Sequence, residues 1–296
     1  APSVNSLVFK KQMWSSYYRL SFDLSVTDAA AYLNAITSIE IDGNSYFCED
    51  GSDLLGCRVL AYYTELERGD TILFLREEKT SRVELFGEDV VRVSGNTVEY
   101  DRNNKLQRYR LAPDFSYIYN GKAKMLTNNQ LTDHFKIDGA LISLIDNDSD
   151  DQYEVVVMDD FVYLHVSNKD ELDGYIYDKI SSENRLDLSD SQCRYEFYQL
   201  EEETWTAAEW DDIKTGALLA AAVSEDGLLA KIYICGQSVS GIVTATDWDS
   251  REIYIDGTGY RLHPYFDTVH KKTNETTGET YYAISLNVNY TFLMGL

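Results

Sequence analysis

The sequence predicts a mainly β protein, built from two or three abutting small antiparallel barrel or sandwich modules with a few short helices. Short apolar and β-branched runs recur at about 8–12-residue spacing and are separated by turn signals, and helical spacing is rare. The chain has three prolines and no Gly/Ser-rich linker, so the modules are expected to abut. The predicted division is 1–90, 91–180 and 181–296.

The first predicted module opens with short strands and contains one helix. Apolar residues at helical spacing over Ala29–Ile36 follow a Thr27-Asp28 cap. Asp42-Gly43 is the strongest hairpin signal in the chain. The strands expected here are Val8–Lys10, Tyr17–Leu24, the hairpin Ile39–Tyr46, Val59–Tyr63 and Thr71–Leu75.

The second predicted module contains a short helix, Asn128–Phe135, and an acidic loop between two apolar runs within Leu141–Val166. Its other strands are expected in Val90–Tyr100, Arg108–Leu111 and Phe115–Tyr119.

The third predicted module contains further hairpins and one more helix. Thr206 to Glu209 matches a capping box, which predicts a short helix from Thr206 through Ile213. The expected strands are Gly174–Ile180, Ala217–Val223, Ala230–Cys235, Val239–Thr246 and Glu252–Ile255.

One internal repeat stands out. The sequence IEIDGNSY at Ile39–Tyr46 recurs as IYIDGTGY at Ile253–Tyr260. The tail after Val239 is therefore expected to be an incomplete copy of the opening module.

The composition narrows the range of partners. Fifty acidic residues against 26 Lys and Arg give a formal charge of −24. Such a surface repels phosphate backbones, so nucleic acid is not an expected partner, whereas cations or a wall polysaccharide are compatible. The acidity is equally explained by solubility alone. No apolar stretch approaches the roughly 20 residues of a membrane helix, so no membrane span is expected.

The chain begins Ala1-Pro2, as a secreted chain would after signal cleavage. The four cysteines match no zinc spacing. Cys48 and Cys57 bracket a short loop, and both a disulfide between them and buried thiols are compatible with the sequence.

The acidic loop is the candidate metal site. Asp146, Asp148, Asp150 and Glu154 occupy positions 1, 3, 5 and 9 of the loop, and the carbonyl of Gln152 adds a further oxygen. Calcium takes 6–8 oxygen ligands, which makes Ca²⁺ the candidate cation. The loop is not an EF-hand, because its twelfth residue is Val157. A solvated acidic turn that binds no metal is the alternative interpretation.

The sequence contains no clear catalytic motif. Gly236–Gly241 falls short of a nucleophile elbow, and the four histidines are scattered. Adjacent carboxylates are expected by chance in so acidic a chain. Among the aromatic residues, Trp248, in a predicted turn, is the first candidate for a contact to another subunit or a glycan.

Three segments of the chain stand out together: VEYDRNNKLQRYRLAPDFSYIYNGKA at Val98–Ala123, LISLIDNDSDDQYEVVVMDDFVYLHVS at Leu141–Ser167 and GYIYDKI. In this order they resemble the repeated β-modules of Firmicutes cell-surface proteins that often carry S-layer homology domains. The resemblance covers about residues 40–296. In the acidic loop, Ser149 and Asp151 replace two glycines of the family, and Glu154 replaces its last aspartate.

The resemblance implies secretion and a structural role at the cell surface. The expected function is that of a non-catalytic subunit of an S-layer-like array or filament, stiffened by calcium. Its expected partners are copies of itself or neighbouring modules, and cell-wall polysaccharide. An adhesin or glycan-binding module is the alternative, and a cell-wall hydrolase is a weaker one.

Overall fold

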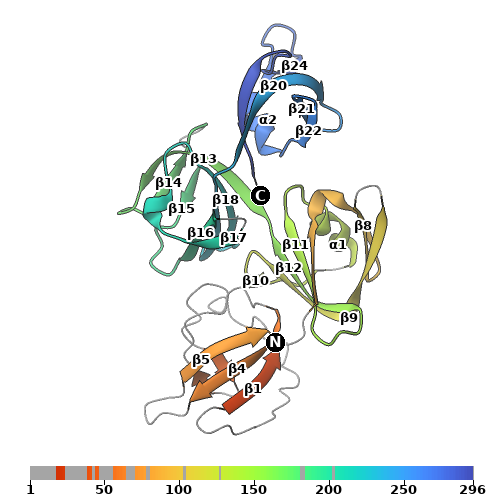
Figure 1. Cartoon of the computed structure of the whole chain (residues 1–296), viewed down its shortest axis with the longest axis vertical. Helices are drawn as coiled ribbons and strands as arrows, with labels where there is room; N and C mark the ends of the chain where they lie inside the picture. The colour runs from red at the N-terminus through yellow and green to blue at the C-terminus, as the bar shows by residue number, and fades with distance from the viewer. Residues whose placement is uncertain are drawn as a thin grey trace. The chain divides into compact units, whose positions relative to one another are not determined.

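The computed structural model describes residues 18–23, 39–41, 44–46, 56–64, 71–77, 81–102, 105–126, 128–180, 184–201 and 204–295. These residues are mainly β-strands, as predicted, and their two α-helices have eight and six residues (Figure 1). Contacts divide the chain into two compact units, with Asp160 ending the main part of the first and Phe161 beginning the second. Strand pairing defines four groups of strands, here called the first to fourth modules.

The first module contains a three-stranded antiparallel sheet in the order β1 (Tyr18–Asp23), β4 (Arg58–Thr64) and β5 (Thr71–Glu77). A separate hairpin pairs β2 (Ile39–Ile41) with β3 (Asn44–Tyr46). The predicted strand Val8–Lys10, the predicted helix Ala29–Ile36 and the Asp42-Gly43 turn lie outside the described residues.

The second module is one curled sheet with the order β6-β11-β12-β9-β8-β7, and a short β10 adds to β9. The end strands β6 and β7 are consecutive in the chain, so the sheet curls until its ends meet at the 3₁₀ turn η3. One pair, β12 with β9, is parallel, unlike the antiparallel pairing predicted throughout. The elements are β6 (Ser81–Phe86), η3 (Gly87–Asp89), β7 (Val90–Ser94), β8 (Thr97–Asp101), β9 (Leu106–Tyr119), β10 (Lys122–Ala123), α1 (Asn128–Phe135), β11 (Leu141–Asp146) and β12 (Gln152–Asp159).

The core of the second module lies inside the curled sheet. Helix α1 was predicted at the residues where it forms, and Leu131 and Phe135, four residues apart on one face, are both buried. They pack with Ile142 and Met158 from the neighbouring strands. Gly87 has room for no side chain, because a Cβ there would lie 2.1 Å from the carbonyl oxygen of Ile137.

The third module has the strand order β15-β14-β13-β18-β19-β16-β17. Strand β18 is almost wholly buried and consists of leucine, alanine and valine. The elements are β13 (Phe161–Asp170), β14 (Tyr175–Asp178), β15 (Arg185–Asp187), β16 (Arg194–Glu201), β17 (Thr204–Ala208), η4 (Trp210–Asp212), β18 (Leu218–Val223) and β19 (Leu229–Cys235).

The predicted helix from Thr206 through Ile213 is wrong. Thr206 lies in β17, opposite Gln199 of β16, because its backbone pairs with that strand rather than starting a helix. A capping box does form three residues later. Glu209 and Asp212 exchange side-chain bonds to each other's backbone N–H groups at the short turn η4.

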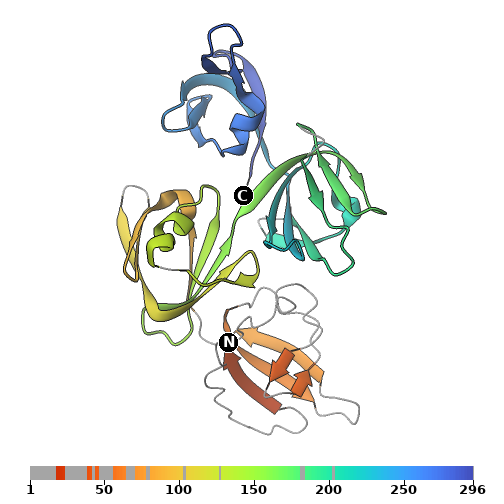
Figure 2. The same ribbon diagram turned by 180° about the vertical axis from the view of Figure 1, so that it is seen from behind.

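The fourth module has a four-stranded sheet with the order β22-β21-β20-β25, drawn in blue in Figures 1 and 2. Its core is small: Val243, Ile253 and Leu262 are buried, and aromatic side chains pack against them. The elements are β20 (Ser238–Asp247), β21 (Glu252–Ile255), β22 (Thr258–Arg261), α2 (Tyr265–His270), β23 (Lys271–Thr273), β24 (Thr280–Tyr282) and β25 (Asn289–Leu293).

One local geometry recurs in the second, third and fourth modules. In each, a buried valine precedes a register shift in its strand's pairing with the next strand. These valines are Val90, Val166 and Val243. Such a β-bulge bends the strand, so each module's sheet turns at an equivalent point.

The following hairpin is also equivalent in these three modules. Its first strand carries a buried branched residue, and the leucine that directly follows the last paired residue of its second strand donates its backbone N–H across the hairpin. The branched residues are Val98, Ile176 and Ile253. The N–H···O=C bonds are Leu111 to Asn96 at 2.7 Å, Leu188 to Gly174 at 2.8 Å and Leu262 to Arg251 at 2.8 Å.

Pairing of the first and last strands relates all four modules. In the first three, the opening strand pairs with a later strand that in turn pairs with the next: β1-β4-β5, β6-β11-β12 and β13-β18-β19. In the fourth, β20 pairs with β25, and β25 has no further neighbour among the described strands. The first and fourth modules also share the hairpin of the sequence repeat, with Ile39 opposite Tyr46 and Ile253 opposite Tyr260.

The pairing changes after β5, β12 and β19, and these points differ from the predicted boundaries at 90 and 180. Three residues separate β5 from β6, one separates β12 from β13 and two separate β19 from β20. The absence of Gly/Ser linkers in the sequence agrees with these short connections.

Candidate metal centre

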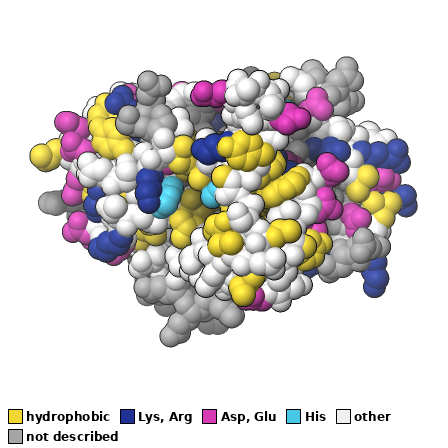
Figure 3. Space-filling view, turned by 90° about the horizontal axis from the view of Figure 1, so that it is seen from above, with side chains coloured by type: hydrophobic (Ala, Val, Ile, Leu, Met, Phe, Trp, Pro, Cys, Tyr) yellow, Lys and Arg dark blue, Asp and Glu magenta, His cyan; other side chains and the backbone are white. Residues whose placement is uncertain are grey.

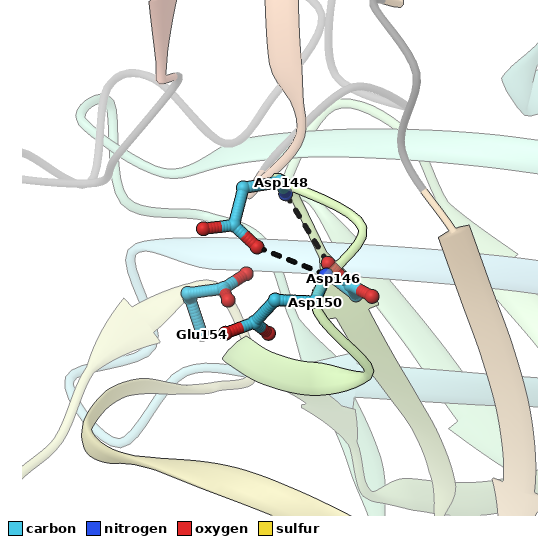
Figure 4. Close-up of side chains that lie close together, drawn as sticks. All are labelled: Asp146, Asp148, Asp150 and Glu154. Atoms are coloured by element: carbon cyan, nitrogen blue, oxygen red, sulfur yellow. Dashed lines mark hydrogen bonds between the residues drawn. The ribbon is translucent and has the colours of Figure 1, made fainter.

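The acidic loop joins β11 to β12, two antiparallel strands in the middle of the second module. Asp146 ends β11, Asp148 and Asp150 lie in the loop, and Glu154 lies in β12 (Figure 4). One carboxylate oxygen from each of these four residues lies within 4.8 Å of the others. Four of the five residues predicted from the sequence are therefore brought together.

Hydrogen bonds within the loop determine its shape. The buried Asp146 accepts backbone N–H groups from Asp148 at 3.2 Å, Ser149 at 2.6 Å and Asp151 at 3.1 Å. Asp148 accepts the N–H of Asp150 at 3.2 Å. These turns within the loop place alternate side chains on its inner side.

The backbone N–H of Gln152 donates to a carboxylate two residues earlier, as the N–H groups above do, and its side-chain amide is a second donor to the same carboxylate. Its backbone N–H donates to Asp150 Oδ1 at 2.8 Å, and its side-chain amide donates to Asp150 Oδ2 at the same distance. The side chain of Gln152 is thus directed to a carboxylate of the cluster.

Two residues of the loop have left-handed backbone. Ser149 has φ of 67° and Asp151 has φ of 64°. Side chains at such angles crowd the backbone, so both residues hold a conformation that glycine adopts without cost.

The four carboxylates of the loop are close enough to repel one another. Burial raises the pKa of the Glu154 carboxyl, and the neighbouring carboxylates of Asp148 and Asp146 act in the same direction. The backbone N–H of Asn147, which donates to Glu154 Oε2 at 2.8 Å, opposes this shift. A cation among these oxygens would relieve the repulsion.

Asn147, a residue that sequence reasoning missed, connects the loop to the start of β4. Its side chain is buried, donates to the carbonyl of Gly56 at 2.8 Å and accepts the N–H of Arg58 at 2.6 Å. Its amide therefore makes the two hydrogen bonds that a neighbouring strand would make to these backbone groups of the first module. An asparagine within an acidic run carries no sequence signal for this long-range role.

The other candidates from the sequence are explained by packing. Trp248 stacks face to face on Tyr282, with ring centroids 4.0 Å apart, and packs against the core of the fourth module. His165 lies in β13, and burial lowers its pKa. Cys48 lies outside the described residues, so a bond to Cys57 is not described, whereas Arg82 donates to the sulfur of Cys57 at 3.3 Å.

The sequence matches no protein-family model and no curated protein. Among the described residues, no helix is long and apolar enough to cross a membrane.

Proposed function

We propose that the protein is a non-catalytic structural component of a bacterial surface assembly, built from tandem β-modules and stiffened by Ca²⁺ at the acidic loop. The observation that supports it best is the recurrence of one strand arrangement along the chain, with one to three residues between successive modules. Tandem copies of a small fold are a common way to extend a structure along a chain.

The acidic loop supports the calcium part of the proposal. Its four carboxylates are oxygen ligands of the kind that Ca²⁺ prefers, and they converge without help from other modules. Because Asn147 connects this loop to Gly56 and Arg58, an ion there would also rigidify the backbone at the start of β4. Stiffening is thus the chemical role proposed for the ion.

The acidic surface agrees with an extracellular setting rich in divalent cations. With a net charge of −24, copies of the chain repel one another unless cations reduce the repulsion. The resemblance to Firmicutes surface modules supports secretion and assembly, and it supports wall polysaccharide as a further partner.

Electron microscopy of the purified protein, with calcium and with a chelator, tests the assembly. We expect sheets or filaments with calcium and their loss in the chelator. Dispersed particles under both conditions would count against it. Calorimetry on Asp146→Ala and Asp148→Ala tests the metal separately, with Asp114→Ala, an exposed carboxylate of the same module, as the control. Calcium binding unchanged in the two loop variants would exclude this site.

A further inference from the structure

One sheet face of the second module is basic, although the protein as a whole is strongly acidic. On the face drawn in Figure 3, Lys and Arg side chains are interspersed with Asp and Glu side chains, as is usual for a soluble protein. Residues 102–110 differ, because they contain four of the chain's 26 Lys and Arg and none of its 50 Asp and Glu. This stretch spans the connection between β8 and β9 and the start of β9.

Strand register places these charges on one side of the sheet. Arg92 of β7 lies opposite Glu99 of β8, which lies opposite Arg108 of β9, so the three side chains form a row across the strands. Arg110, two residues further along β9, points to the same side, whereas Tyr109 between them packs against the core. The row therefore lies on the outer face of the sheet.

One buried carboxylate holds this row in place. Glu99 is 7% exposed and accepts hydrogen bonds from Arg92 Nε at 2.8 Å and from Arg108 Nε at 3.1 Å. The two arginine side chains remain 61% and 65% exposed, so each keeps N–H donors at the surface. Because one carboxylate faces two guanidinium groups, positive charge stays in excess there.

Further positive charge and an apolar side chain surround the row. The other basic residues are exposed and make no ion pair within the part of the chain that the structure describes: Arg102, Lys105 and Arg110. Leu106, at the start of β9, is 51% exposed. We call the outer surface formed by these residues the basic face: Arg92, Arg102, Lys105, Leu106, Arg108 and Arg110.

A turn in the third module has the opposite charge around an exposed leucine. Leu172, between β13 and β14, is 99% exposed, and its neighbours Asp170, Glu171 and Asp173 are acidic. The backbone N–H of Asp173 donates to Asp170 Oδ1 at 3.2 Å, which closes this acidic turn and leaves Leu172 at its tip. A single exposed leucine is ordinary at a protein surface, so the charges around the two leucines carry the argument.

Charge complementarity identifies the occupant of the basic face as a second copy of the chain. The third module, residues 161–235, contains 16 Asp and Glu against six Lys and Arg. Its acidic turn offers carboxylates around an apolar tip, and the basic face offers positive side chains around Leu106. Opposite charges around an apolar centre fix the register of a contact and exclude surfaces of like charge.

We propose that copies of the protein join head to tail, with the acidic turn of one copy docked on the basic face of the next. The two surfaces differ, so each contact leaves a basic face on one copy and an acidic turn on the other, to which further copies can add. The inference rests on the proposed function as a self-assembling component, and it names the surfaces that the copies use.

Sedimentation velocity in a chelator, from micromolar to submillimolar protein in about 0.1 M salt, tests the contact. The Debye length is then about 10 Å, which screens the repulsion between whole copies more than the attraction between charges in contact. The chelator keeps the charge of the acidic loop constant, because that loop borders the basic face where Gln152 lies opposite Arg110. We expect association that increases with protein concentration and weakens in about 1 M salt.

Charge reversal on the basic face should weaken this association by at least about tenfold. The face variant is Arg102→Glu with Lys105→Glu, which leaves the ion pairs of Glu99 intact. Its control is Lys271→Glu with Lys272→Glu, at two exposed lysines of β23, which changes the net charge by the same amount. The control should associate much more strongly than the face variant.

Charge reversal on the acidic turn should also weaken the association by at least about tenfold. The turn variant is Glu171→Lys with Asp173→Lys. Because it reduces the negative net charge, general repulsion alone predicts stronger association for it, which is the opposite of what the contact predicts. Far-ultraviolet circular dichroism shows whether each variant keeps its β structure.

A mixture of the face variant and the turn variant gives the most specific result. The face variant keeps an intact acidic turn, and the turn variant keeps an intact basic face. We therefore expect one-to-one complexes in the mixture, although each variant alone stays largely monomeric. An isologous contact between two identical surfaces would not show this rescue.

Three results would overturn the proposal: an unchanged protein that stays monomeric throughout, a mixture of the two variants without complexes, or equal weakening by the lysine control. Binding of the basic face to an anionic polysaccharide such as alginate, without self-association, would also overturn it. Electron microscopy separates this contact from the proposed function. Calcium-dependent sheets formed equally by the face variant would refute the contact alone, whereas complexes of the two variants without sheets or filaments under any condition would support the contact and count against the proposed assembly.

Discussion

At the scale of single residues, the acidic loop is held by backbone conformations that its sequence does not favour. Asp151 has φ of 64°, and its exposed side chain accepts none of the hydrogen bonds described for the loop. Its own backbone N–H donates to Asp146, and those of its neighbours Asp150 and Gln152 donate to Asp148 and Asp150. The loop therefore carries local strain at Ser149 and Asp151, and substitution of Asp151 can remove its share.

Asp151→Gly should stabilise the second module. Relief of the left-handed strain exceeds the entropy that glycine adds to the unfolded chain, so we expect the free energy of unfolding in urea to rise by about 0.5–1 kcal/mol. The measurement is made in a chelator to exclude effects on a bound ion. Asp114→Gly, the same change at an exposed position within β9, should lower it by a similar amount. Equal effects at both positions would show that strain at Asp151 is negligible.

The pH dependence of this loop follows from Glu154. Its pKa in the folded protein is raised above the ordinary 4.5, so the folded state holds the proton more tightly than the unfolded chain. The stabilising contribution is complete below pH 4.5 and is lost as the pH rises through the raised pKa. In a chelator, Glu154→Gln should reduce the loss of urea resistance above pH 4.5. An identical pH profile for the two proteins would contradict the raised pKa.

At the scale of elements, close approach between a strand and a neighbouring turn determines which residue a position can hold, as the hydrophobic pattern does for the core. Gly241 lies in β20, where an added Cβ would be 2.3 Å from Asp256 Oδ2 and 2.6 Å from Ile255 Cγ2. The side chain of Asp256 also accepts the backbone N–H of Ile242 at 3.1 Å. The hairpin turn after β21 thus returns onto the strand at a position where only glycine fits.

Gly241→Ala should therefore destabilise the fourth module. The methyl group displaces Asp256 or bends β20, and we expect a loss of about 1–3 kcal/mol. Unfolding of this module can be followed through the fluorescence of Trp248. Gly236→Ala is the matched control, because nothing lies within 4 Å of its Cβ position, and it should leave stability nearly unchanged. Similar stabilities for the two variants would show that the contact at Gly241 relaxes freely.

The sequence predicts those elements whose cause is local. The hairpin of Val239–Thr246 and Glu252–Ile255 was predicted from its turn residues, and β20 and β21 do pair antiparallel there. Helix α1 was predicted from its own spacing. The Thr206 helix failed because a local capping pattern competed with pairing to β16, a partner that local reasoning does not see. The parallel pair of β9 and β12 is equally a matter of topology.

The candidate site also combines features with a local cause and features that depend on residues far away in the sequence. The convergence of Asp146, Asp148, Asp150 and Glu154 followed from their alternate spacing in one loop. The role of Asn147 depends on Gly56 and Arg58, about 90 positions earlier in the chain, and no local pattern indicates it. The sequence repeat showed only the relation between the first and fourth modules. The recurrence in the second and third modules was hidden, because the separation of the branched residue from the leucine differs in each copy.

At the scale of the whole molecule, the large net charge means that a specific effect of calcium on assembly must be distinguished from general screening by salt. The net charge of −24 opposes self-association, and any added electrolyte screens it. Raising the ionic strength from about 0.01 to 0.15 M shortens the screening length from about 30 to 8 Å. An assembly that requires only screening would therefore form in sodium chloride alone.

We expect calcium to act differently from salt of the same ionic strength. If the ion binds the acidic loop, millimolar calcium should promote assembly when sodium chloride at matched ionic strength does not, and magnesium should be weaker because it demands a stricter octahedral set of ligands. The variant Asp146→Ala should lose the calcium response but keep any response to salt. Light scattering across this series distinguishes the two cases, because equal scattering in calcium and in matched sodium chloride would assign the effect to the surface charge as a whole.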